Sequence, residues 1–156
     1  MEGKPVKASS LIMTQIMRQQ DVNLAGNVHG GSIVKAMDTT AGIVAYRHAR
    51  TNVVTASIDR VDFVHPVYVG NLITLDACIN YVGRTSMEIG VRVDAEDIFS
   101  GESRHVASAY FTYVSLSEDG KPRVLPPLLL ETDEERSRNR EAQARREARL
   151  RERSSD

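Results

Sequence analysis

The sequence predicts one α+β domain in which an antiparallel sheet curls around a single long helix. Two observations support this prediction. Small and apolar residues cover most of the circumference of a predicted helix near residues 30–50, a pattern typical of a buried helix. After residue 51 the hydrophobic period changes from about 3.6 to about 2 through four long segments with short connections. Such alternation indicates an antiparallel sheet with one polar face.

The elements are expected in the order strand, helix, then four strands. The first strand is predicted at residues 11–18, and the loop at residues 21–31 leads into a helix that begins near Gly30 or Ser32 and ends near Arg50. The later strands are predicted at residues 52–64, 70–82, 85–99 and 104–116. In the segment 70–82, one face is expected to carry Ile73, Leu75, Ala77, Ile79 and Tyr81.

The chain length fits one domain with a hydrophobic core, because it has 156 residues of which 41% are hydrophobic. The domain is expected to span residues 9–127, after a flexible N-terminus at residues 1–8. Pro122, Pro126 and Pro127 mark its end. Residues 128–156 are predicted to form a charged tail or a solvated helix, stabilised by i,i+4 pairs such as Glu141 with Arg145.

The composition excludes several classes of function. The net charge of -1 gives no electrostatic case for binding nucleic acid or an anionic membrane. No apolar run reaches the roughly 20 residues of a membrane span, and the N-terminus lacks an apolar signal region. The single cysteine, Cys78, rules out an intrachain disulfide and suits a cytoplasmic protein. The four histidines show no paired ligand spacing, so no metal site is expected.

Asp38 is the first candidate for chemistry, since it lies well inside the apolar helix. For most helical acids, exposure or a salt bridge to a neighbour such as Lys35 is the better explanation. At 100° per residue, however, Asp38 shares its helix face with Gly31, Gly42 and Ala45, which keep a groove open. Loss of solvent disfavours a carboxylate charge at such a position unless another group compensates, and groups of this kind are often functional.

Gly30 and Gly31 form the second candidate, at the start of the same helix. Glycines there let another molecule approach the free amides of the first turn, which can stabilise a carbonyl oxygen as it becomes an oxyanion. A plain helix entry that needs glycine explains these residues about equally well. The seven residues from Gly31 to Asp38 span two turns on one face, which favours the functional interpretation.

Two further groups are weaker candidates. Asn23 is a candidate to orient water or a carbonyl group, whereas Asn27 is expected mainly to form an Asx turn or a cap. Arg84, Thr85 and Ser86 follow Gly83 at a connection between strands and have groups that bind phosphate. A plain hairpin turn is the better explanation of this segment by itself.

Several of these segments, taken together, resemble the cytosolic acyl-CoA thioesterases of the hotdog fold. The resemblance covers residues 9–127 and keeps the family's motif order. It rests on GNVHGG, then MDTTAGIVAYRHARTNVVTASIDRVDF, VGRTSMEIGVRVDAED and ASAYFTYVSLSEDGKP. It implies hydrolysis of acyl-CoA to a fatty acid and CoA, without a cofactor because CoA is part of substrate and product. It also implies a central helix wrapped by five or six antiparallel strands, and a homodimer with a continuous sheet, assembled further into a trimer of dimers.

The resemblance also implies roles for individual residues. Asn23 of one subunit and Asp38 of the other would form the active site, with the amides of Gly30 and Gly31 as the oxyanion hole. Residues 84–86 would lie near the CoA phosphates and pantetheine. Some relatives are tandem proteins in which each hotdog half supplies part of a site. This chain is expected to be a single hotdog that holds both Asn23 and Asp38.

Three questions stay open at the level of sequence. Asp38 is either a general base on water or a direct nucleophile. The first alternative function is a hotdog enoyl-CoA hydratase or dehydratase, in which His29 would be paired with an acid. The second is an acyl-CoA sensor that binds without hydrolysis.

Overall fold

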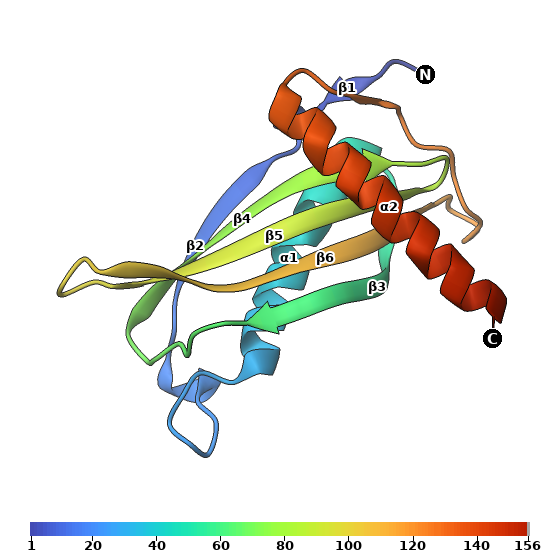
Figure 1. Ribbon diagram of the computed structural model, residues 1–156. Helices are drawn as coiled ribbons and strands as arrows, with labels where there is room; N and C mark the ends of the chain where they lie inside the picture. The colour runs from blue at the N-terminus through green and yellow to red at the C-terminus, as the bar shows by residue number, and fades with distance from the viewer. Residues whose placement is uncertain (156) are drawn as a thin grey trace.

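The computed structural model describes residues 1–155, and it consists of a sheet with one helix on each face (Figure 1). The α-helices are α1 (Gly30–Ala49) and α2 (Asp133–Ser155). The strands are β1 (Lys4–Pro5), β2 (Leu11–Ile16), β3 (Asn52–Phe63), β4 (Asn71–Val82), β5 (Ser86–Asp97), β6 (Ser103–Leu116) and β7 (Leu128–Leu129). Two short 3-10 turns occupy Val6–Ala8 and Gln19–Asp21. Neither α-helix in residues 1–155 has the length and apolar character to cross a membrane.

The main sheet has five antiparallel strands in the order β2-β4-β5-β6-β3, which confirms the predicted architecture. β4, β5 and β6 form a meander, whereas β3 returns to pair with β6 at one edge. α1 lies across the inner face, and its contacts include β2, β3, β4, β5 and β6. The short β1 and β7 pair in parallel outside this sheet.

The core lies between α1 and the inner face of the sheet. α1 buries Ile33, Met37, Ala41 and Val44 against strand residues such as Phe111. The alternation predicted for β4 is confirmed through Ile73, Leu75, Ala77 and Ile79, each at most 1% exposed. Tyr81 breaks the pattern, because the register shifts between Ile79 and Tyr81. Its ring lies 5.9 Å from the Arg146 guanidinium of α2, so the prediction that Tyr81 shares the face of Ile79 is wrong.

α2 crosses the outer face of the sheet (Figure 1), and its contacts with that face include hydrogen bonds and ion pairs. Ala142 is buried, while Asn139 donates a hydrogen bond to the backbone carbonyl of Asn80. The partner expected for Arg145 was Glu141. Arg145 instead makes a bidentate pair with Glu88, which is only 2% exposed. One side of this helix therefore docks on the sheet, whereas many of its remaining side chains are exposed.

β3 is an edge strand, and several of its apolar side chains are exposed. Val54, Ile58 and Phe63 are 43%, 40% and 49% exposed. Register shifts follow Thr55 and Asp59, and Arg60 adopts a left-handed φ of 53°. An open edge with exposed apolar side chains is suited to pairing with another strand.

Candidate active site

The Asp38 carboxylate lies in the third turn of α1, half-buried and facing the beginning of β3. Its Oδ1 accepts a hydrogen bond of 2.9 Å from the Thr55 hydroxyl and one of 2.5 Å from the Tyr113 hydroxyl. The helix supplies the acid, the edge strand supplies one hydroxyl, and the neighbouring strand β6 supplies the other. Hydrogen bonds to a carboxylate are stronger than those between neutral groups, so these two contacts fix the orientation of Asp38.

Tyr113 is buried, and its hydroxyl also lies 2.7 Å from the backbone carbonyl of Asp38. Burial and the hydrogen bond to Asp38 raise the pKa of Tyr113 well above its usual value. The phenol therefore stays protonated and remains a hydrogen-bond donor. Gly42, one turn after Asp38, lies beside this hydroxyl, and a β-carbon there would be in ordinary van der Waals contact, 3.4 Å from the Tyr113 oxygen.

A hollow of about 340 Å³ opens beside these groups. Its polar lining includes Asp38, Thr39, Thr55 and Tyr113, and exposed Ile43 and Tyr46 line it from α1. A carboxylate anchored at one oxygen and open on the other side has the geometry of a general base or a nucleophile.

Asn23 lies in the loop before α1, and its side chain organises that loop. Its Oδ1 accepts hydrogen bonds from the backbone amides of Ala25 (2.9 Å) and Asn27 (3.2 Å). The Asx role expected of Asn27 therefore belongs to Asn23. Because the carbonyl oxygen is engaged, the amide nitrogen of Asn23 is the part of the side chain left to donate.

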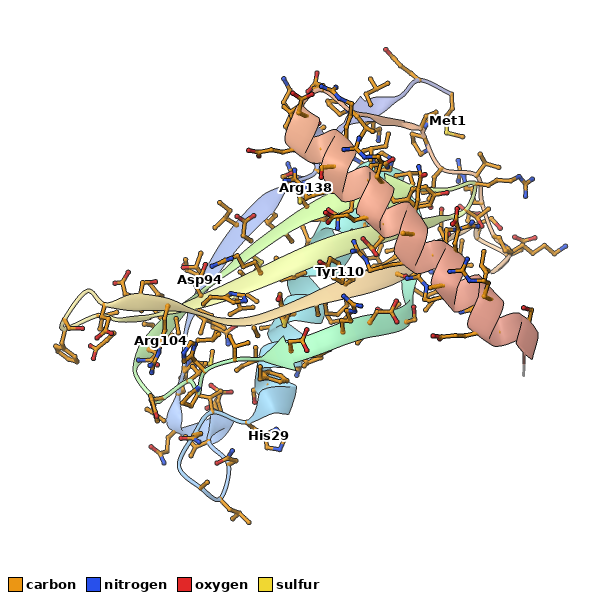
Figure 2. All side chains as sticks on the ribbon, viewed as in Figure 1. Met1, His29, Asp94, Arg104, Tyr110 and Arg138 are labelled. Carbon is orange, nitrogen blue, oxygen red and sulfur yellow. The ribbon has the colours of Figure 1, made fainter. Side chains whose placement is uncertain are left out.

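Of the two backbone amides predicted to form the oxyanion site at the start of α1, one is free and the other already donates a hydrogen bond. The amide of Gly31 donates a 3.0 Å hydrogen bond to Nδ1 of His29, which caps the helix from an exposed position (Figure 2). The amide of Gly30 donates to no acceptor within residues 1–155. The Phe63 ring lies against Gly30, where a β-carbon would be 3.4 Å away.

A second hollow, of about 290 Å³, joins Asn23 to the helix start. Its lining includes Asn23, Asn27, Gly30 and Phe63. The hollow beside Asp38 shares no lining residue with it. Within one chain, Asn23 and Gly30 are thus brought together, while Asp38 lies in a separate place.

The two hollows flank opposite ends of β3. The Asp38 hollow includes Val53 and Thr55 near its beginning, whereas the Asn23 hollow includes Phe63 at its end. This placement connects both hollows to the open edge of the sheet.

Arg84, Thr85 and Ser86 lie at the hairpin between β4 and β5 and line neither hollow. The carbonyl of Arg84 accepts a hydrogen bond from the Leu125 amide, and that of Thr85 accepts one from the Ser115 amide. The backbone of this segment is therefore bonded both to β6, through Ser115, and to the chain after β6, through Leu125. The Arg84 side chain is exposed.

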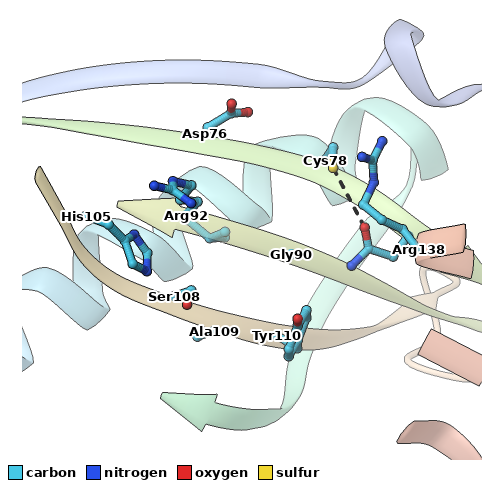
Figure 3. Close-up of a pocket in the computed structure, with 11 residues that line it drawn as sticks. Asp76, Cys78, Gly90, Arg92, His105, Ser108, Ala109, Tyr110 and Arg138 are labelled. Atoms are coloured by element: carbon cyan, nitrogen blue, oxygen red, sulfur yellow. Dashed lines mark hydrogen bonds between the residues drawn. The ribbon is translucent and has the colours of Figure 1, made fainter. Parts of the chain in front are cut away.

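A third hollow, of about 330 Å³, lies on the outer face of the sheet beside α2 (Figure 3). Cys78, Arg92, Tyr110 and Arg138 contribute to it. Burial raises the pKa of the Cys78 thiol. None of the residues predicted for catalysis lines this hollow, so it is separate from the candidate site.

The sequence analysis missed Thr55 and Tyr113. Both lie in strands predicted from their alternation, and Thr and Tyr are common in strands, so neither residue type drew notice. Tyr113 lies 75 residues from Asp38, and Thr55 lies 17 residues away. For Tyr113 the available signal was a polar residue on the buried face of a predicted strand, since a buried hydroxyl needs a partner. Thr55 is exposed and offered no such signal.

Known proteins are similar to this chain in both sequence and fold. A model of the Thioesterase superfamily matches residues 25–99. The mouse protein named cytosolic acyl coenzyme A thioester hydrolase is 40% identical over 146 residues, which are 92% of this chain and 38% of that protein. The chain thus spans less than half the length of that relative. Protein VdlD of Helicobacter pylori is 38% identical over 143 residues, covering 92% of this chain and 82% of that protein.

Two solved structures match nearly the whole chain. An apo-hexameric acyl-CoA thioesterase is 36% identical, with a TM-score of 0.93 and 97% coverage of each chain. The Staphylococcus aureus acyl-CoA hydrolase in complex with butyryl coenzyme A, coenzyme A and coenzyme A disulfide is 33% identical, with a TM-score of 0.89, covering 97% of this chain and 93% of that one. That enzyme has also been solved as alanine variants of an aspartate, an asparagine and a threonine. The chain therefore belongs to the hotdog-fold acyl-CoA thioesterase family.

Proposed function

We propose that this protein hydrolyses acyl-CoA thioesters to a free fatty acid and CoA, with Asp38 as the reacting carboxylate. The observation that carries this proposal is the Asp38 carboxylate itself. Thr55 and Tyr113 anchor one of its oxygens at the wall of an open hollow. A structural acid needs no such opening, whereas a general base or nucleophile needs both a fixed position and access to substrate.

The spacing of the candidate residues supports the same conclusion. In the Staphylococcus aureus acyl-CoA hydrolase, the asparagine, aspartate and threonine replaced by alanine are 15 and 17 residues apart along the chain. These are the separations of Asn23, Asp38 and Thr55 here. The agreement extends to Thr55, which the contacts of Asp38 identify independently.

The complete site is proposed to form between two chains. When two β3 edges pair antiparallel about a two-fold axis, the beginning of one strand lies beside the end of the other. The Asp38 hollow of one subunit then meets the Asn23 hollow of its partner, and the dimer has two such sites. The exposed apolar side chains Val54, Ile58 and Phe63 favour this pairing. Because hexameric acyl-CoA thioesterases are among the similar structures, we propose a trimer of such dimers.

Each candidate group has a role in the proposed reaction. The free amide of Gly30 and the side-chain amide of Asn23 line one hollow, so both are proposed to come from the partner of the subunit that supplies Asp38 and to donate to the thioester carbonyl oxygen. Gly31 joins them only if its amide leaves His29. The exposed Arg84, with Thr85 and Ser86, is proposed to bind the CoA phosphates. CoA leaves as a product, so the reaction needs no cofactor, and the cytosolic name of the mouse relative favours a cytoplasmic location.

His29, the residue on which the hydratase alternative depends, has a structural role at the start of α1. Nδ1 of His29 accepts the Gly31 amide as a helix cap, and His29 lines neither hollow of the candidate site. No contact of His29 with Asp38 exists among the described residues.

The proposal is tested by measuring free-thiol release from acyl-CoA with the wild type and with Asp38→Asn. We expect the variant to lose turnover by orders of magnitude and to keep its thermal midpoint. Near-normal activity of Asp38→Asn contradicts the proposed site. Hydration of crotonyl-CoA without thiol release supports the hydratase instead, and a tight complex with intact acyl-CoA supports the sensor. Single turnover in oxygen-18 water then separates the two roles of Asp38, because only a nucleophilic carboxylate acquires the label.

A further inference from the structure

The two oxygens of the Asp38 carboxylate have different surroundings. Oδ1 accepts hydrogen bonds from both Thr55 and Tyr113. Both hydrogen bonds to this carboxylate among the described residues end on Oδ1, so Oδ2 has no partner there. The same Tyr113 hydroxyl lies 2.7 Å from the backbone carbonyl of Asp38, so it contacts the side chain and the main chain of one residue.

We propose that Tyr113 is a positioning residue that anchors Asp38 through Oδ1 and presents Oδ2 as the oxygen that reacts. The inference rests on the proposed hydrolase function and deepens it. The buried ring of Tyr113 is held in the core, on a strand that pairs with both neighbours. A contact from such a rigid ring to two atoms of Asp38 restricts the side-chain rotamer of the acid more than a contact from the exposed edge strand alone.

The proton of Tyr113 stays in place under working conditions. Burial and the neighbouring Asp38 raise the pKa of the Tyr113 phenol. The Tyr113 hydroxyl has one proton, so it donates one hydrogen bond at a time, either to Oδ1 or to the backbone carbonyl oxygen of Asp38. In both arrangements the oxygen of Tyr113 stays beside Oδ1, so Oδ2 remains the open side of the carboxylate.

Gly42 lies beside the Tyr113 hydroxyl. A β-carbon at position 42 would lie 3.4 Å from the Tyr113 oxygen and 3.8 Å from the nearest ring carbon, which are ordinary van der Waals distances. The oxygen is therefore the first atom that a side chain larger than alanine would press upon.

With Asp38 as a general base, hydrolysis of the thioester proceeds by proton transfer to and from Oδ2. Oδ2 accepts a proton from water as the water oxygen bonds to the thioester carbon. The carbon–sulfur bond then breaks, and its electron pair leaves on sulfur. The proton on Oδ2 passes to that sulfur, which gives the free acid and the CoA thiol and restores the carboxylate.

Tyr113→Phe tests the inference, because it removes one oxygen atom and keeps the ring. We expect kcat for thiol release to fall about 10- to 100-fold, the effect of losing one hydrogen bond to a charged group, with KM within about twofold. Tyr110→Phe is the matched control, since Tyr110 lies on the same strand but packs on the outer face under Arg145. We expect the control to keep wild-type kcat.

Gly42→Val provides a second test in which the hydroxyl is retained. An alanine β-carbon would be in ordinary van der Waals contact with the Tyr113 oxygen, whereas the methyl groups of valine extend beyond that position, so kcat is expected to fall several-fold. In the Tyr113→Phe background the same substitution meets no hydroxyl and is expected to cause no further loss. The double-mutant cycle measures the coupling between positions 42 and 113. If Tyr113→Phe is unstable, a fall in kcat without a change in KM in the folded Gly42→Val protein still tests the position of the Tyr113 oxygen.

The outcomes separate the two proposals. A wild-type protein that releases no thiol overturns the proposed function. An active wild type, an inactive Asp38→Asn and a fully active Tyr113→Phe overturn the positioning role alone. A change confined to KM, or equal losses from Gly42→Val in both backgrounds, also overturns the positioning role.

Discussion

The Arg145 guanidinium of α2 donates two hydrogen bonds of 2.8 Å to the Glu88 carboxylate on β5. Glu88 is 2% exposed, and Asn80 donates a third hydrogen bond to it. The Arg145 guanidinium also stacks 3.6 Å from the centre of the Tyr110 ring. This group of side chains joins the last helix to the sheet.

Arg145→Met is expected to destabilise the protein, since it leaves the Glu88 carboxylate buried without its cation. Breaking a buried ion pair in this way costs about 3–5 kcal/mol. The loss cannot exceed the free energy by which α2 docks on the sheet, because undocking of α2 exposes Glu88 to water. Urea unfolding should show this loss, and amide exchange in α2 should accelerate. The exposed Arg151→Met is the control on the same helix. Equal stability of the two variants contradicts the role of the pair, while Glu88→Met combined with Arg145→Met should recover most of the loss.

Thr55→Val is expected to lower kcat about tenfold, because it removes the second donor to Oδ1 of Asp38 while keeping the shape of the side chain. Steady-state thiol release measures the effect. Thr55→Ser keeps the hydroxyl and is expected to restore most of the activity. If valine and serine give the same rate, the hydroxyl of Thr55 has no part in the reaction.

Much of the fold could be predicted because it follows local patterns. The inner face of β4 was readable from alternation through Ile79. Tyr81 was not, since the bulge before it depends on pairing with β5. Arg145 offered a local partner, Glu141, and the sheet provided a better one in Glu88. Contacts made by distant segments carry little signal in one sequence.

In the candidate site, Asp38 could be predicted from the sequence, whereas the residues around it could be predicted only in part. Asp38 was conspicuous because small residues share its helix face. Its two donors come from β3 and β6, which only the folded sheet brings beside α1. The Gly31 amide was expected to be free, but the preceding His29 caps it, a contact that depends on side-chain geometry.

Mixing two inactive variants tests whether each site uses both subunits. In a dimer of Asn23→Ala with Asp38→Asn, one shared site receives both wild-type residues and the other receives both substitutions. Random pairing makes half of the dimers mixed, so co-expression should recover about a quarter of wild-type activity. Each variant alone should stay near zero. If Asn23 and Asp38 of the same chain worked together, every site in the mixture would be defective and no activity would return.

His48 is expected to make the protein sensitive to acid. Burial lowers the pKa of His48 below its usual value of 6.5, and the Lys4 charge lowers it further, although the hydrogen bond to the Pro126 carbonyl opposes this effect. The unfolded chain therefore binds a proton at His48 more readily than the folded protein does. The resulting stability is present above about pH 6.5 and is lost as the pH falls toward the folded value.

The test compares the free energy of unfolding in urea at about pH 7.5 and about pH 5.5. The wild type should lose more stability between these conditions than His48→Gln, whose amide cannot take up a proton. Lys4→Met should also reduce the loss, because it removes the cation that opposes the charged imidazole. An identical loss in the wild type and in His48→Gln assigns the acid sensitivity to other groups.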